Sequence, residues 1–264
     1  MKNLSYVLAF VFSVALMQSC QKEPLIDTGA PELPSKESFI MPFTGFEDTD
    51  TTKSFSNWFY AASNVVVWNA VLTVNLAVPV ASFYESFNHD AQFQGNSTWM
   101  WSYSFNAQGS QYTAKLYGQI LNDNEVGWEM YISRTGAFTD VQWYNGVTAI
   151  DRSYATWTLR QNGFNPTDFI GIEYHADNGN GARSIRYTNI IPNNQGNGGY
   201  IEYQETLDNT ATFNRSYDVF KIELNNLLEI DWNNINNEGR VKDPQKYNDE
   251  DWHCWDSGLQ DTQC

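Results

Sequence analysis

Residues 112–133, YTAKLYGQILNDNEVGWEMYIS, decide the fold because apolar side chains recur there at every second position. Successive side chains of a β-strand point to opposite faces of a sheet, so this period of two predicts strands with one buried face and one wetter face. The turn-forming sequence Asn122-Asp123-Asn124 divides the stretch into two such runs. The sequence therefore predicts a β-hairpin.

Similar alternating runs lie on both sides of this hairpin. Short segments rich in Gly, Asn and Asp separate them, and Asn145-Gly146 is interpreted as one of these turns. About ten strands are expected, at residues 97–106, 112–120, 126–133, 138–145, 152–161, 168–175, 183–191, 199–206, 213–222 and 225–232.

Short connections of this kind make successive strands antiparallel neighbours. A meander of about ten strands tends to close into a barrel, or to fold into a sandwich, because an open sheet leaves exposed edges. We therefore expect a mainly β fold in which residues 97–235 form an antiparallel barrel or sandwich.

An uncharged segment precedes the strands. No charged residue occurs from Ser54 to Tyr84, and the centre of this segment, 65–78, is apolar nearly all round. The run is too long for one strand and Pro79 is typical of a helix end, so the pattern predicts a helix over about 52–78. Such a helix must be covered by protein or by lipid.

We expect protein to cover it, with the helix region, residues 39–96, packed in or against the barrel. A membrane-spanning helix is the first alternative, but Asn64, Asn69 and Asn75 would each cost free energy in hydrocarbon. A pair of Val-rich strands is the second, because β-branched residues are poor helix formers.

The N-terminus has the pattern of an export signal. Lys2 is followed by an uncharged, mostly apolar run from Leu4 to Leu16, which is too short to span a bilayer. Met17-Gln18-Ser19-Cys20 then resembles the lipobox of bacterial lipoproteins, with Met17 where leucine is more usual. Gln21-Lys22-Glu23 is similar to the surface-export signal of Bacteroidota lipoproteins.

This resemblance to a Bacteroidota-type outer-membrane lipoprotein implies a signal peptide over residues 1–19 and a lipid on Cys20. The membrane is then a partner through that lipid, and the protein is held at the outer membrane, facing the periplasm or the cell surface. Residues 20–38 contain three prolines and little that is apolar, so they are interpreted as a flexible tether.

The chain is strongly acidic, with a formal net charge of −16. Such a surface repels phosphate backbones, which argues against nucleic-acid binding. Once Cys20 is acylated, Cys254 and Cys264 remain, and we expect them to form a disulfide in an acidic C-terminal tail, residues 236–264. A metal site that includes His253 is the alternative.

Catalytic motifs are scarce, and we expect no catalytic residues, no metal and no cofactor. None of the three histidines has a metal-ligand spacing such as His-Glu-x-x-His. Glu173 and His175 would share one strand face, where a carboxylate can orient an imidazole, but a solvated pair is the simpler interpretation.

Aromatic residues make up 16 % of the chain and are the stronger functional signal. Exposed rings on neighbouring strands can stack on sugar faces, although large aromatics in strands are more often part of a core. The candidate binding residues are Trp99, Trp101, Tyr103, Trp128, Trp143 and Trp157.

Together these features predict a membrane-anchored, non-enzymatic binding module for a glycan or an apolar ligand. One alternative is a structural or assembly component of the envelope, with a helix-filled barrel and no ligand. Another is a glycan hydrolase, which would need two carboxylates about 5 to 10 Å apart in a cleft.

Overall fold

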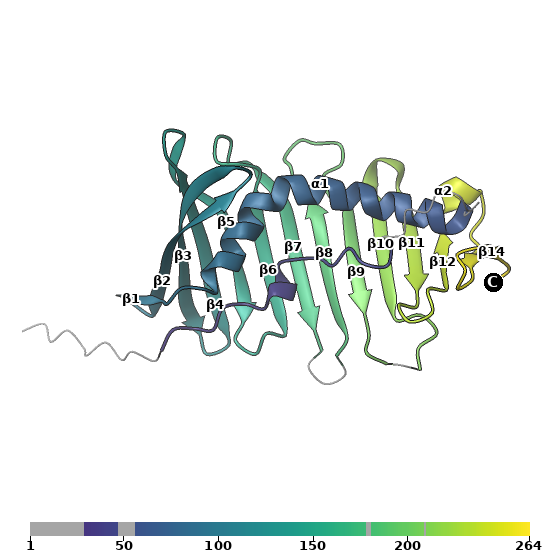
Figure 1. Cartoon of the computed structure of the whole chain (residues 1–264), viewed down its shortest axis with the longest axis horizontal. Coiled ribbons are helices and arrows are strands. Elements are labelled where there is room, and N and C mark those ends of the chain that lie inside the picture. The colour runs from purple at the N-terminus through teal and green to yellow at the C-terminus, as the bar shows by residue number, and fades with distance from the viewer. Residues whose placement is uncertain (1–28, 47–55, 178–180, 209) are drawn as a thin grey trace, which may run out of the picture.

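The computed structural model describes residues 29–46, 56–177, 181–208 and 210–264, so Cys20 and the predicted signal peptide lie outside the described residues. A long helix, α1 (Ser56–Ser86), lies across one face of a single sheet (Figure 1). Three short helical segments accompany it: η1 (Lys36–Ser38), η2 (Ile222–Leu224) and α2 (Pro244–Tyr247).

The described residues form fourteen strands, joined in chain order into one antiparallel meander. The strands are β1 (Gln92–Gly95), β2 (Thr98–Ala107), β3 (Ser110–Asn122), β4 (Glu125–Arg134), β5 (Phe138–Ala149), β6 (Tyr154–Arg160), β7 (Asp168–Ala176), β8 (Arg183–Asn189), β9 (Tyr200–Glu205), β10 (Arg215–Lys221), β11 (Asn226–Trp232), β12 (Gly239–Lys242), β13 (His253–Trp255) and β14 (Asp261–Thr262).

All ten expected strands are present, and the mainly β antiparallel prediction is confirmed. β1 precedes them. The segment interpreted as an acidic tail supplies β12, β13 and β14, so it extends the sheet.

The predicted closure into a barrel is wrong, because β1 and β14 stand at opposite edges of an open sheet. Two features remove the need for closure. The edge strands have only four and two residues, which leaves little unpaired backbone. The apolar face of the sheet is covered by α1 and by residues 29–46 instead of by an opposite barrel wall.

Helix α1 packs on the sheet along one side only. Its C-terminal end lies eight residues beyond the predicted one, with Pro79 inside the helix. A proline removes one helical hydrogen bond and bends the axis, and the ribbon bends in its C-terminal half (Figure 1). The buried side includes Trp58, Ala61, Val65, Leu72, Leu76 and Phe83.

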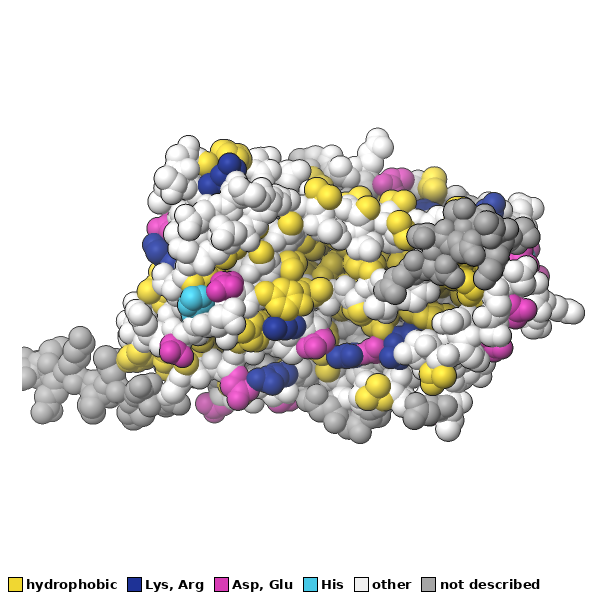
Figure 2. Space-filling model, viewed as in Figure 1, with side chains coloured by type: hydrophobic (Ala, Val, Ile, Leu, Met, Phe, Trp, Pro, Cys, Tyr) yellow, Lys and Arg dark blue, Asp and Glu magenta, His cyan; other side chains and the backbone are white. Residues whose placement is uncertain are grey.

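An extended segment, residues 39–46, runs beside α1 on the same face of the sheet (Figure 1). Tyr187 fixes it, because its hydroxyl donates to the Phe39 carbonyl at 2.8 Å and accepts from the Met41 N–H at 2.9 Å. Phe39 also stacks on Phe83 of α1, with ring centroids 4.6 Å apart. Helix and segment together leave part of the face open, where Figure 2 shows hydrophobic side chains.

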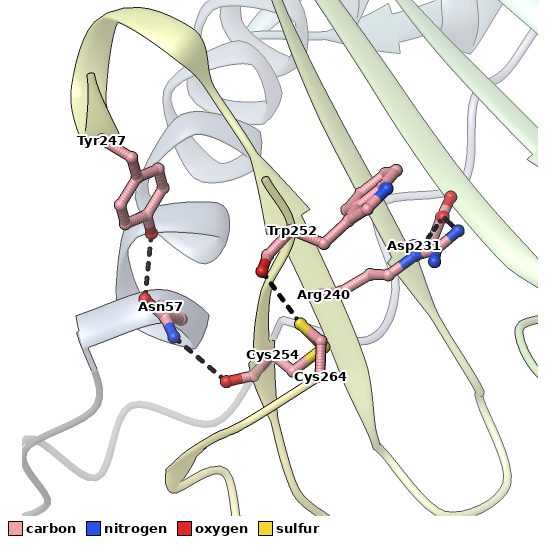
Figure 3. Close-up of a disulfide and its surroundings, with 7 residues drawn as sticks. All are labelled: Asn57, Asp231, Arg240, Tyr247, Trp252, Cys254 and Cys264. Atoms are coloured by element: carbon pink, nitrogen blue, oxygen red, sulfur yellow. Dashed lines mark hydrogen bonds and ion pairs between the residues drawn. A yellow bond between two sulfur atoms is a disulfide. The ribbon is translucent and has the colours of Figure 1, made fainter. Parts of the chain in front are cut away.

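The C-terminal strands hold the start of α1. The predicted disulfide is confirmed, because Cys254 and Cys264 are bonded (Figure 3). The Asn57 side chain donates to the Cys254 carbonyl at 3.0 Å and accepts from the Tyr247 hydroxyl at 3.1 Å. Asp261 accepts from the Asn57 backbone N–H at 2.9 Å, so a carboxylate stabilises the helix N-terminus.

Strand β5 continues through Asn145-Gly146, so the turn predicted there is wrong. Gly146 has another role: an added Cβ would lie 2.3 Å from the Thr156 carbonyl oxygen and 2.3 Å from the Trp157 ring. The glycine lets a buried indole cross the neighbouring strand at close range.

We predict that Gly146→Ala lowers the free energy of unfolding by about 2 kcal/mol, because backbone and ring must both move. Gly171→Ala is the control, since its new methyl group would meet only the Ile190 side chain, with Cγ2 nearest at 3.4 Å. We expect its effect to stay within about 1 kcal/mol in urea unfolding. Equal losses for the two variants would contradict this packing.

Candidate functional site

The six aromatic residues predicted to bind a ligand belong to the core. Each side chain is between 1 and 6 % exposed. The Trp128 indole donates to Thr148 Oγ1 at 2.8 Å, and the Trp157 indole donates to the Ser38 carbonyl at 3.0 Å. A sugar face cannot reach these rings in this conformation. The buried set is Trp99, Trp101, Tyr103, Trp128, Trp143 and Trp157.

A cavity of about 410 Å³ lies between α1 and the segment 40–43. We call it the apolar hollow. Its lining consists of Ile40, Met41, Phe43, Asn69, Leu72, Thr73, Leu76, Ala77, Val80 and Tyr187.

The two hydroxyl groups of the apolar hollow are already used within the protein. Thr73 donates to the Asn69 side chain at 2.9 Å, and the Tyr187 hydroxyl bonds to the backbone of the extended segment. Leu72 and Leu76 are only 2 and 4 % exposed. The hollow therefore presents mainly hydrocarbon, which suits an apolar ligand better than a sugar.

The other side of α1 is exposed and also apolar. Val67 and Val74 are 63 and 65 % exposed, and Phe59 is 59 % exposed. The helix is long and apolar enough to cross a membrane by length and composition, with 33 % of its most apolar window buried. Protein covers only one side of it, so the expectation of an enclosed helix holds for that side alone.

A second cavity, of about 290 Å³, borders the apolar hollow. We call it the charged hollow. Ile40 lines both cavities, so its side chain stands between them. The charged side chains around the second cavity are Lys36, Glu37, Arg183, Glu205 and Arg215.

Three of these side chains form a row across adjacent strands. In the sheet register, Glu205 of β9 lies between Arg183 of β8 and Arg215 of β10. Its carboxylate is 5 % exposed and pairs with both guanidinium groups, at 3.0 Å for Arg215 Nε. The Tyr203 hydroxyl donates to the same carboxylate at 2.7 Å, and burial, then Glu205, raise the pKa of this hydroxyl.

Lys36 also lines the charged hollow. Its ammonium lies 4.7 Å from the centroid of the Tyr84 ring, and Tyr84 also lines the cavity. Figure 2 shows a row of basic and acidic side chains below the hydrophobic area that contains the apolar hollow. With three cations and two carboxylates, this rim is locally positive in a chain of net charge −16.

Acidic residues gather on the opposite face of the sheet. Asp218 lies across from Glu202 on one side and Glu229 on the other. Burial, then Glu229 and Glu202, raise the pKa of Asp218 from its ordinary 3.8 to about 6. Arg186 pairs with Glu202 and Lys242 pairs with Glu229, so the cluster is a row of cross-strand ion pairs around Asp218. Asp218 lines neither hollow.

The remaining sequence candidates, Glu173 and His175, lie two positions apart in β7 and so share one face of that strand, as predicted. In the sheet register Glu173 lies opposite Arg186, and His175 lies opposite Ser184. Within the described residues, no group of three or more His, Cys, Asp and Glu side chains has a geometry that could hold a metal ion.

Sequence reasoning missed both hollows. The run Phe39-Ile40-Met41-Pro42-Phe43 was a usable signal for the wall of the apolar hollow, because it is apolar at every position and directly follows the predicted tether. The Arg183–Glu205–Arg215 row depends on strand register, which no local pattern encodes.

Comparison with known protein families, with curated proteins and with solved structures finds no match for this chain. Its function is therefore inferred from the side chains around the two hollows.

We predict that Asp218→Asn raises the free energy of unfolding at pH 8 by about 1 to 2 kcal/mol, after allowance for partial solvent screening. Because folding raises the pKa of Asp218 from 3.8 to about 6, ionisation of Asp218 opposes folding increasingly between these two pH values and fully above pH 6. The gain should shrink as the pH falls below 6 and disappear near pH 4, where wild-type Asp218 is protonated in the folded state. Urea unfolding of the wild type and of Asp218→Asn at pH 4 and pH 8 measures this gain. A gain independent of pH would contradict the raised pKa of Asp218.

Proposed function

We propose that this protein is a membrane-anchored envelope lipoprotein that binds an apolar ligand in the apolar hollow. The observation that carries the proposal is the cavity itself, about 410 Å³ lined mainly by hydrocarbon and open beside α1. Binding pockets for small molecules are typically about 300–1,000 Å³, so its size suits one small ligand or one alkyl chain.

The driving force for binding would be hydrophobic. Each methylene group moved from water into such a site contributes roughly 0.8 kcal/mol. The groups that form the walls are held by the fold, because Tyr187 fixes the extended segment and α1 packs on the sheet. Little ordering is then required on binding, which favours affinity.

The glycan version of the binding hypothesis has less support, because the rings proposed for it are 1 to 6 % exposed. The hydrolase alternative has a carboxylate cluster around Asp218, but each glutamate there is paired with a cation. Of the glycan ligand, the apolar ligand and the hydrolase, the apolar ligand is therefore preferred.

The chain from Gln21 to Cys264 keeps every described residue and suits a binding test. An uncharged apolar dye, N-phenyl-1-naphthylamine, should gain fluorescence on binding, and 1-tetradecanol should displace it. Ala77→Phe should weaken dye binding about tenfold or more by filling the apolar hollow.

Val67→Phe is the matched control, because Val67 is 63 % exposed and does not line the cavity. It should leave dye binding unchanged. Binding lost in Val67→Phe and kept in Ala77→Phe would move the site to the exposed side of α1. No saturable binding of dye or alcohol would overturn the proposed function, and tryptophan quenching by soluble polysaccharides instead would favour the glycan version.

The anchor is tested separately. We predict that cells expressing the full chain incorporate radiolabelled palmitate into it and that Cys20→Ala abolishes the incorporation, because the acyl chains are attached at this residue. Cys264→Ser should still be labelled. Label retained in Cys20→Ala would contradict the lipoprotein assignment.

A further inference from the structure

The apolar hollow and the charged hollow together specify a ligand with two different ends. One cavity is lined by hydrocarbon, and its neighbour carries Lys36, Arg183 and Arg215 on its rim. Their common wall is Ile40. A purely apolar molecule would use only the first cavity and leave the cations of the second to solvent.

The cations lie at one end of this sheet face. On β8 and β10 the face continues into core residues such as Ile185 and Tyr217, and at the far end of β10 Lys221 donates to Asn64 of α1 at 3.1 Å. Arg183 and Arg215 share that face at the strand ends, and Glu205 between them is 5 % exposed. Charges placed beside an apolar surface cost free energy unless they are paired, and Glu205 supplies this pairing for both arginines.

Glu205 does not use all the N–H donors of the two guanidinium groups beside it. It lies between the two guanidinium groups, and Arg183 reaches it through Nε while its side chain remains 42 % exposed. An arginine fork in this position can bind a second carboxylate through its terminal nitrogens. Lys36 lines the same cavity and adds a further positive charge to those of the two arginines.

We propose that the ligand is a single-chain amphiphile with a carboxylate head, of the long-chain fatty acid class, whose tail fills the apolar hollow and whose head lies at Arg183 and Lys36. This inference rests on the proposed function and names its ligand. The size of the apolar hollow, about 410 Å³, suits one alkyl chain better than the two chains of a phospholipid.

The test compares two probes that share a tail. Tetradecanoic acid and 1-tetradecanol are titrated by dye displacement into the chain from Gln21 to Cys264 at pH 8 and low salt. The acid should bind about tenfold more tightly than the alcohol, and added salt should narrow the difference.

Two variants locate the head. Arg183→Gln should weaken binding of the acid about five- to twentyfold and leave the alcohol unchanged. Lys36→Gln, an exposed position, should act in the same direction without disturbing the pairing of Glu205. Arg186→Gln is the control, because Arg186 lies on the opposite face of β8 and pairs with Glu202. Thermal unfolding confirms that each variant is folded.

Equal affinity for acid and alcohol in the wild type would overturn this inference and leave the proposed function intact. An equal loss in Arg183→Gln and Arg186→Gln would also overturn it, because the effect would then follow net charge. If neither probe bound at all, the proposed function itself would fail.

Discussion

The fold depends on how the apolar face of one open sheet is kept from water. In a closed barrel the opposite wall would cover it. Here α1 and residues 29–46 cover it, fixed by Tyr187 and by the stacking of Phe39 on Phe83. The start of α1 is held in turn by Asp261 and by the strands that the Cys254–Cys264 disulfide joins. The architecture follows from this one requirement.

Coverage by a helix and a single segment is incomplete, and this is where function can arise. A helix is a cylinder and an extended segment is narrow, so the two cannot tile a twisted sheet without gaps. The apolar hollow lies where Leu72 and Leu76 meet Met41 and Phe43. The charged hollow lies where the sheet face ends in charged residues. In the proposed function, this imperfect cover is the binding site.

The strands were readable from the sequence because a half-buried strand imposes a period of two. All ten expected strands occur, and the disulfide followed from the position of two cysteines near the end of the chain. Barrel closure could not be predicted, because it depends on whether the two edge strands, β1 and β14, pair with each other. The alternation of side chains within one strand carries no information on that pairing. Gly146 resembled a turn residue, but the crossing Trp157 ring explains it.

The candidate site was harder to predict because its chemistry is distributed along the chain. Six aromatic residues drew attention as a binding platform, whereas the sheet uses them as core. The groups that line the hollows come from residues 36–44, from α1 and from the ends of β8, β9 and β10. Only the strand register places Arg183, Glu205 and Arg215 in one row, and only the packing of α1 leaves the cavity beside it.

The most direct measurement is a crystal structure of the chain with a fatty acid brominated at the end of its tail, because bromine reports its own position by anomalous scattering. We predict one bromine site between α1 and residues 41–43, near Leu72 and Leu76, with the carboxylate toward Arg183. A bromine on the exposed side of α1 near Val67 and Val74, or no ordered bromine at all, would contradict it.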